Sequence, residues 1–148
     1  MLAAIRPDSW NLPLFLHVLG AMVLAGGTGA VVVLGVRRHR YAQHAALLTR
    51  LSFRTLVFLV LPAWILMRVS AQLIADKEYP HNGPGWLDVG YTVSEGGLLV
   101  LIAAGILAWV GLRRGGMGRA AAAVPALAAL YLVALAVAWW AMSAKPGA

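Results

Sequence analysis

Four long stretches of the chain are almost purely apolar, and short segments carrying most of the charge separate them. The stretches cover residues 12–36, 56–75, 90–112 and 120–142. A helix rises about 1.5 Å per residue, so about 20 residues cross the roughly 30 Å hydrocarbon core of a bilayer. Each stretch reaches that length, and the connections are too short to hold a separate domain. The pattern predicts an all-α fold, an integral membrane antiparallel four-helix bundle that forms one transmembrane domain over residues 1–148.

Composition supports the same class. The chain has 148 residues, of which 61% are hydrophobic and 11% charged, and its mean hydropathy is +0.80. These values lie far from those of a soluble globular domain. The chain has no cysteine, which excludes disulfides, thiolate metal sites and lipid attachment through cysteine.

The distribution of charge predicts an orientation. Arginines gather in the first and third connections, which hold no acidic residue: Arg37, Arg38, Arg40, Arg50 and Arg54, then Arg113, Arg114 and Arg119. Basic loops stay on the cytoplasmic side, so we expect both termini to be extracytoplasmic. The net charge of +7 then reflects topology and contact with anionic lipid headgroups, and no nucleic-acid partner is expected. Abundant alanine, glycine and arginine with almost no lysine indicate a GC-rich bacterial genome, and hence a bacterial plasma membrane.

Three ionisable side chains lie inside the apolar stretches: His17, Arg68 and Glu95. Such groups are costly in a bilayer, so they face protein or water and are candidates for function. Counted from the outer end of each span, they lie about five, seven and five residues in, which is roughly 7 to 10 Å at helical rise. Gln72 lies one turn outward from Arg68, and Tyr91 one turn outward from Glu95. The spacing therefore predicts one polar layer and an outward-opening pocket in the outer leaflet.

The helix face that carries His17 is small and slightly polar. It contains His17, Gly20, Ala21, Leu24, Thr28 and Gly35, at about 100° per residue. Small residues are typical of a tight contact between membrane helices, so His17 is expected to point into the bundle. Two interpretations remain open, a neutral histidine hydrogen-bonded across helices and a histidine that binds a ligand or handles a proton.

Arg68 has three interpretations of its own. It can form a structural ion pair with Glu95, because an unpaired charge at that depth is costly. It can instead extend toward the outer headgroups. It can also bind an anionic ligand group, such as a carboxylate or a porphyrin propionate.

Several ligands are compatible with His17 as a metal or cofactor ligand. Haem b held by two histidines needs a second inward imidazole, but His39, His44 and His81 lie in connections. The second iron ligand would then be water, His17 of another subunit or a methionine. The methionines available for this are Met67, Met142 and Met22. Copper as Cu(I), bound by imidazole and thioether, is a weaker candidate, because His17 and Met22 are five positions apart and point about 140° away from each other. A quinone hydrogen-bonded by His17, Tyr91 or Arg68 is as compatible as either metal.

Motifs for nucleophilic hydrolysis and for phosphate binding are missing. No G-x-S-x-G motif occurs, and "AGGTGA" lacks the lysine of a phosphate-binding loop. Glu95 is the only acid in a span, so no catalytic carboxylate pair is expected. The sequence does not predict an enzyme.

The opening "LFLHVLGAMVLAGG", with a histidine followed by paired glycines, resembles a family of small four-helix bacterial membrane proteins of unknown function. The arginine-rich first connection, the tryptophan in "GWLDVGY" and the length agree with that resemblance. The same opening is similar to the first helix of copper resistance protein D and of the membrane protoporphyrinogen oxidase. That second resemblance implies a haem-associated role for His17.

Two function classes follow. The first is a cofactor-binding or redox-related membrane protein that uses His17, with Arg68, Glu95, Tyr91 and Gln72 around it. The second is a non-catalytic accessory or packing subunit, whose glycine-rich first helix associates with a membrane partner or as a homo-oligomer. A small transporter is disfavoured, because no pair of broken helices is evident.

Overall fold

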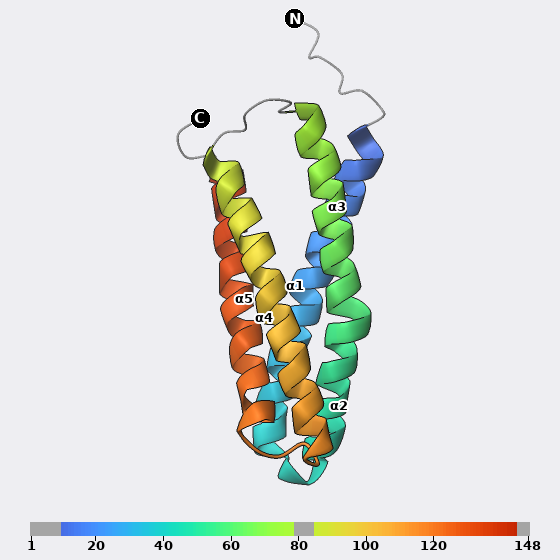
Figure 1. The fold of residues 1–148 in the computed structure, drawn as a ribbon, viewed down its shortest axis with the longest axis vertical. Coiled ribbons are helices and arrows are strands. Elements are labelled where there is room, and N and C mark those ends of the chain that lie inside the picture. The colour runs from blue at the N-terminus through green and yellow to red at the C-terminus, as the bar shows by residue number, and fades with distance from the viewer. Residues whose placement is uncertain (1–9, 79–84, 145–148) are drawn as a thin grey trace, which may run out of the picture.

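A computed structural model describes residues 10–78 and 85–144 of the chain. Within these residues the protein is helical and forms an antiparallel bundle (Figure 1). The helices are α1 (Asn11–Arg40), η2 (Ala42–His44), α2 (Ala45–Thr55), η3 (Leu56–Val60), α3 (Leu61–Glu78), α4 (Gly85–Arg113) and α5 (Arg119–Ala144). Because α2, η3 and α3 follow one another without a break, the described residues contain four long apolar helices, each long enough to cross a membrane. The predicted all-α class is confirmed, whereas His81 lies outside the described residues.

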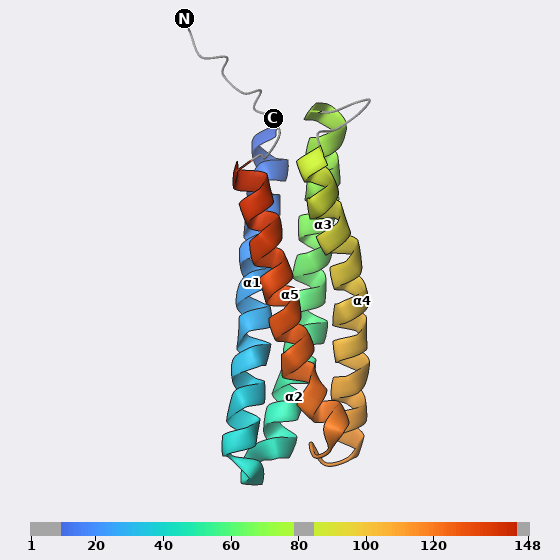
Figure 2. The ribbon, with the colours of Figure 1, turned by 90° about the vertical axis from the view of Figure 1, so that its left-hand side faces the viewer.

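The four long helices are arranged as two pairs. Helix α1 packs along α3, and α4 packs along α5, while α3 and α4 touch at few points. Helix α5 also packs against α1, and Figure 2 shows it inclined from α1 toward the lower part of α4. We call the end where α1 begins and α5 ends the upper end, as drawn in Figure 1. The pairs approach each other at the lower end and diverge toward the upper end (Figure 1).

The first connection is more helical than the apolar pattern predicted. Helix α1 continues to Arg40, and helical structure resumes at Ala42 and runs on to residue 56, where the second span was expected to begin. The expectation of a loop over residues 37–55 is therefore wrong. The physical reason is an amphipathic α2, which buries small side chains one turn apart and exposes its arginines. The buried residues are Ala45, Thr49 and Ser52.

Glycines set the closest approaches between helices. A Cβ added to Gly20 would lie 2.8 Å from the backbone nitrogen of Met67 and 3.1 Å from the carbonyl oxygen of Ala63. At the lower end Gly35 accommodates the ring of Pro125 in the same way. The residues Gly20, Leu24, Thr28 and Gly35 are buried, so the predicted contact face of the first helix is confirmed.

The turn between α4 and α5 closes the lower end. Gly116 has φ +79, a conformation that favours glycine, and it lies against the backbone of Ala45. The guanidinium of Arg38 donates a hydrogen bond of 2.9 Å to the carbonyl oxygen of Gly116. This turn therefore joins both helix pairs at the lower end.

Candidate functional site

A cavity of about 620 Å³ lies between the two helix pairs, and α1, α3, α4 and α5 all contribute to its wall. Its lining is mainly alanine, leucine, valine and methionine side chains. A volume of roughly 300–1,000 Å³ and an apolar wall with few polar groups are typical of small-molecule sites. The polar side chains that reach it are His17, Arg68, Tyr91, Ser94 and Trp139.

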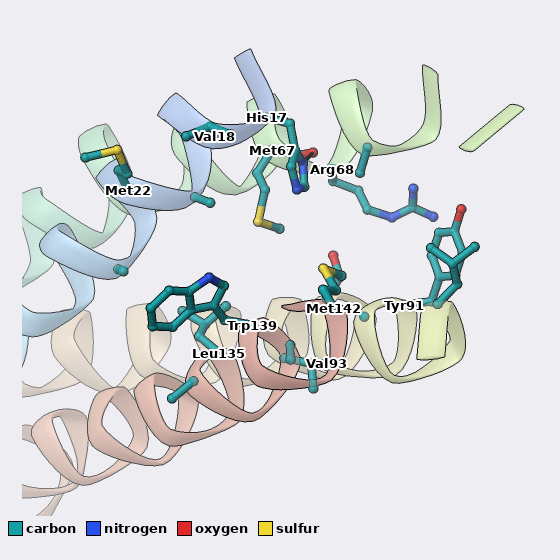
Figure 3. Close-up of a pocket in the computed structure, with 18 of the residues that line it drawn as sticks. His17, Val18, Met22, Met67, Arg68, Tyr91, Val93, Leu135, Trp139 and Met142 are labelled. Carbon is teal, nitrogen blue, oxygen red and sulfur yellow. Dashed lines mark hydrogen bonds between the residues drawn. The ribbon is translucent and has the colours of Figure 1, made fainter. Parts of the chain in front are cut away.

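His17 projects from α1 to the edge of this cavity (Figure 3). Its Nδ1 lies 3.1 Å from the carbonyl oxygen of Met67 on α3. A carbonyl oxygen only accepts, so Nδ1 carries the proton and donates, and in the neutral tautomer that fits this bond Nε2 carries the lone pair. Within the described residues no hydrogen bond satisfies Nε2. Of the two interpretations of His17, the hydrogen bond across helices is confirmed. The same bond leaves Nε2 available as an acceptor or metal ligand, so the second interpretation stays a prediction.

Arg68 joins α3 to α4 beside the cavity. Its Nε donates to Oε1 of Glu95 at 2.8 Å, so the ion pair, the first of the three interpretations of Arg68, is confirmed. Its Nη1 donates to Oε1 of Gln72 at 2.9 Å, and the hydroxyl of Tyr91 lies 3.4 Å from the same oxygen. The guanidinium carbon also lies 4.9 Å from the centroid of the Tyr91 ring, and Nε2 of Gln72 donates to Asp76 at 2.7 Å. We call these five residues, on α3 and α4, the clasp.

The predicted polar layer is therefore divided in two. His17, Arg68 and Tyr91 line the cavity, whereas Glu95 and Gln72 are absent from its lining and contact Arg68 instead. The side chain of Arg68 is 23% exposed and that of Glu95 is 57% exposed. Arg68 belongs to both parts, because it lines the cavity and forms the ion pair of the clasp.

Three methionines line the cavity from different sides. Met67 lies on the same wall as His17, and Met142 of α5 lies on the opposite wall, near Tyr91 (Figure 3). The terminal methyl of Met142 occupies the space that a side chain at Gly90 would fill. Met22 is 69% exposed, so most of its surface faces away from the bundle.

Two features of the site were not predicted from the sequence, the hydrogen bond of Trp64 and the space at Gly90 that Met142 fills. The indole nitrogen of Trp64 on α3 donates a hydrogen bond of 3.0 Å to the carbonyl oxygen of Ser94 on α4. The hydroxyl of Ser94 itself is buried and has no partner within the described residues. No sequence signal identifies the Trp64 contact, because its acceptor is a backbone group. The space at Gly90 does have a signal, a glycine in the outer part of an apolar helix.

In the part of the chain that the structure describes, no three histidine, aspartate or glutamate side chains gather closely enough to hold a metal ion. A metal in this cavity would therefore depend on His17 together with thioether sulfurs or an organic ligand.

Comparisons of the chain with protein-family models, with curated proteins and with solved structures find no match. The resemblances of the opening segment therefore stay predictions. The function has to be argued from the cavity and its side chains.

Proposed function

We propose that the protein is a membrane-embedded binding protein for a flat apolar ligand with an acidic edge, held by Nε2 of His17, and that haem b is this ligand. One observation carries the proposal. The hydrogen bond from Nδ1 of His17 to the carbonyl of Met67 leaves the Nε2 lone pair at the edge of a largely apolar cavity of about 620 Å³.

The side chains around the cavity fit haem b in three respects. An imidazole whose other nitrogen donates to a carbonyl is an oriented ligand for iron. The alanine and leucine lining suits the apolar macrocycle. Arg68 has five N–H donors, of which the clasp uses two, so donors remain for a propionate. When bound, the haem would supply one-electron chemistry or serve as the cargo.

Cu(I) fits the described residues less well. A copper site of one imidazole and several thioethers needs the sulfurs to converge on His17. Met142 stands on the opposite wall and Met22 is largely exposed. A quinol is an alternative ligand, because its hydroxyl could donate to Nε2 of His17. A ligand that is purified with the protein and contains no iron would identify a quinol in place of haem b.

The placement in a membrane is part of the proposal. We propose a bacterial plasma membrane with both termini extracytoplasmic, because the arginines of residues 37–54 and 113–119 belong to the lower end. The acidic residues of the described chain lie toward the upper end: Asp76, Glu78, Asp88 and Glu95. The cavity would then be reached from the outer leaflet.

The alternative function is that of an accessory subunit. It is favoured by one observation, that Gly26 of α1 has no neighbouring atom within 4 Å of an added Cβ and is available to a partner helix. Gly20, Gly27 and Gly35 are already in contact with α3, η3 and α5. The surface left for a partner on α1 is therefore smaller than the glycine count indicates.

The test is to purify the protein in detergent, titrate it with haem b and record the Soret and visible bands together with iron and copper content. We expect a saturable Soret band in the wild type and its loss in His17→Ala. The matched controls are His39→Ala and His44→Ala, since both histidines are exposed at the lower end. A wild type that takes up no haem, or a His17→Ala variant with an unchanged spectrum, would overturn the proposal in favour of the accessory role.

A further inference from the structure

The cavity has two opposite walls, each formed by a different helix pair. A flat ligand in it would contact one wall with each of its two faces. His17 and Met67 come from the α1–α3 pair, while Trp139 and Met142 come from α5 of the other pair (Figure 3). If Nε2 of His17 holds the iron from one face, as proposed above, a second axial ligand from the same chain has to come from the opposite wall. The question is which side chain on that wall can supply it.

Thioether sulfur is the donor that this chain offers. Apart from His17, the described cavity lining holds no imidazole, thiolate or carboxylate, but it holds three methionines. Iron held by histidine and methionine is a common arrangement in electron-transfer haem proteins, where the thioether raises the reduction potential. The choice therefore lies between Met67, Met22 and Met142.

Two of the three sulfurs are badly placed. Met67 shares a wall with His17, because its carbonyl oxygen accepts the hydrogen bond from Nδ1 at 3.1 Å. Its backbone is also held against Gly20, so its side chain starts from the same wall as His17. Met22 follows His17 by five positions on the same helix, which turns it about 140° away, and its side chain is 69% exposed.

Met142 meets the requirement. It lies across the cavity from His17 and at a similar height in the bundle (Figure 3). Its methyl group occupies the space left by the missing side chain of Gly90, so the end of this flexible side chain is held against α4. Figure 3 shows its sulfur on the cavity side. Arg68 stands further toward the upper end (Figure 3), where its remaining donors would meet the acidic edge of a ligand held by His17.

We infer that Sδ of Met142 is the second axial ligand of haem b in this cavity, opposite Nε2 of His17. The inference rests on the proposed function and adds the residue and the coordination state to it. It makes the bound haem six-coordinate and low-spin, and it makes the haem a link between the two helix pairs. It also assigns a role to Gly90, which positions Met142.

The experiment compares haem-loaded wild type with Met142→Leu, using Met67→Leu and Met22→Leu as matched controls. Leucine conserves volume and apolar character, so folding should be retained, and gel filtration in detergent verifies this. We expect Met142→Leu to keep its haem, to change from low-spin to high-spin absorption and electron paramagnetic resonance signals, and to bind carbon monoxide when reduced. The reduction potential of a Met142→His variant should fall while its spectrum stays low-spin.

The outcomes separate the two proposals. Loss of the low-spin signals in Met142→Leu alone supports the inference. Three results overturn it: a low-spin spectrum in Met142→Leu like that of the wild type, loss of the low-spin signals in Met67→Leu as well, or a high-spin spectrum in the wild type itself. In each case, haem bound through His17 would still support the proposed function. If the wild type takes up no haem, or if His17→Ala binds it unchanged, the proposed function fails and this inference with it.

Discussion

At the scale of single residues, a glycine in a long apolar helix matters through what stands opposite its missing side chain. Gly20 faces backbone atoms of α3, whereas an added Cβ on Gly26 meets nothing within 4 Å. Backbone cannot yield as a side chain can, so we expect Gly20→Ala to lower the free energy of unfolding by about 1–3 kcal/mol. It should also weaken haem uptake, because the α1–α3 contact positions the His17 bond to Met67.

The matched control is Gly26→Ala, which should change stability by no more than about 1 kcal/mol and in the stabilising direction, since alanine is the better helix former. Thermal unfolding in detergent and a haem titration measure both variants. Equal losses in the two variants would show that the α1–α3 approach does not depend on Gly20.

Tyr131 provides a second test at this scale. Its ring lies over Gly97 and is 1% exposed, and its hydroxyl is buried without a partner within the described residues. A buried unsatisfied hydroxyl costs about 1–3 kcal/mol, so Tyr131→Phe should raise the free energy of unfolding.

The control for Tyr131→Phe is Trp64→Phe, which removes a hydrogen bond that is formed, the 3.0 Å bond to Ser94. That variant should lose at least the roughly 0.5–1.5 kcal/mol of the hydrogen bond, because the smaller ring also gives up part of the packing of Trp64 against the core. The same unfolding assay compares both, and a destabilised Tyr131→Phe would contradict the description of its hydroxyl as unpaired.

The sequence predicted which residues share a depth, but not which of them share a cavity. Depth follows from the rise per residue, so His17, Arg68 and Glu95 could be placed in one layer by counting. Rotation about each helix axis is set by packing, which is why Glu95 lies outside the cavity lining. The partner of His17 is a backbone carbonyl, which no pattern of side chains reveals.

At the scale of helices, the clasp is the main polar link between α3 and α4. Both partners of its ion pair are partly exposed, with exposed side-chain fractions of 23% for Arg68 and 57% for Glu95, and we expect this edge of the bundle to face water at the upper end. We therefore expect a double-mutant cycle of Arg68→Ala and Glu95→Ala, in ligand-free protein, to give a coupling of about 0.2–1 kcal/mol. The coupling should shrink as salt is added.

The coupling is obtained from the unfolding midpoints of four proteins, the wild type, the two single variants and the double variant. Each is measured at low and at high ionic strength. A coupling that does not change with salt would contradict the placement of the pair at an exposed edge. No coupling at all would mean that the Arg68–Glu95 pair adds nothing to the contacts that Trp64 and Tyr91 make between the two helices.

Helix number could be predicted from hydropathy, whereas helix length could not. Apolar runs mark only the part of each helix that suits hydrocarbon, so α2 with its arginines was assigned to a connection. Its helical state depends on burial of Ala45, Thr49 and Ser52 in the bundle. That is a tertiary effect, which a search for apolar runs does not detect.

At the scale of the whole molecule, the two ends are held by different interactions. The lower end has close contacts of Gly35 with Pro125 and of Gly111 with Ala121, and the bond from Arg38 to Gly116. At the upper end α3 and α4 meet mainly through the clasp and Trp64. Separation of the helix pairs is therefore easiest at the upper end, which is where the cavity lies.

The side of the membrane from which that cavity is reached can be tested directly, because the chain has no cysteine and single cysteines label without background. Ser143 and Ala46 are exposed at the upper and lower ends. The arginines of the lower end should hold it in the cytoplasm. A membrane-impermeant maleimide should therefore label Ser143→Cys in intact cells and Ala46→Cys only after permeabilisation. The reverse pattern would contradict the proposed orientation and would place the cavity mouth at the cytoplasmic face.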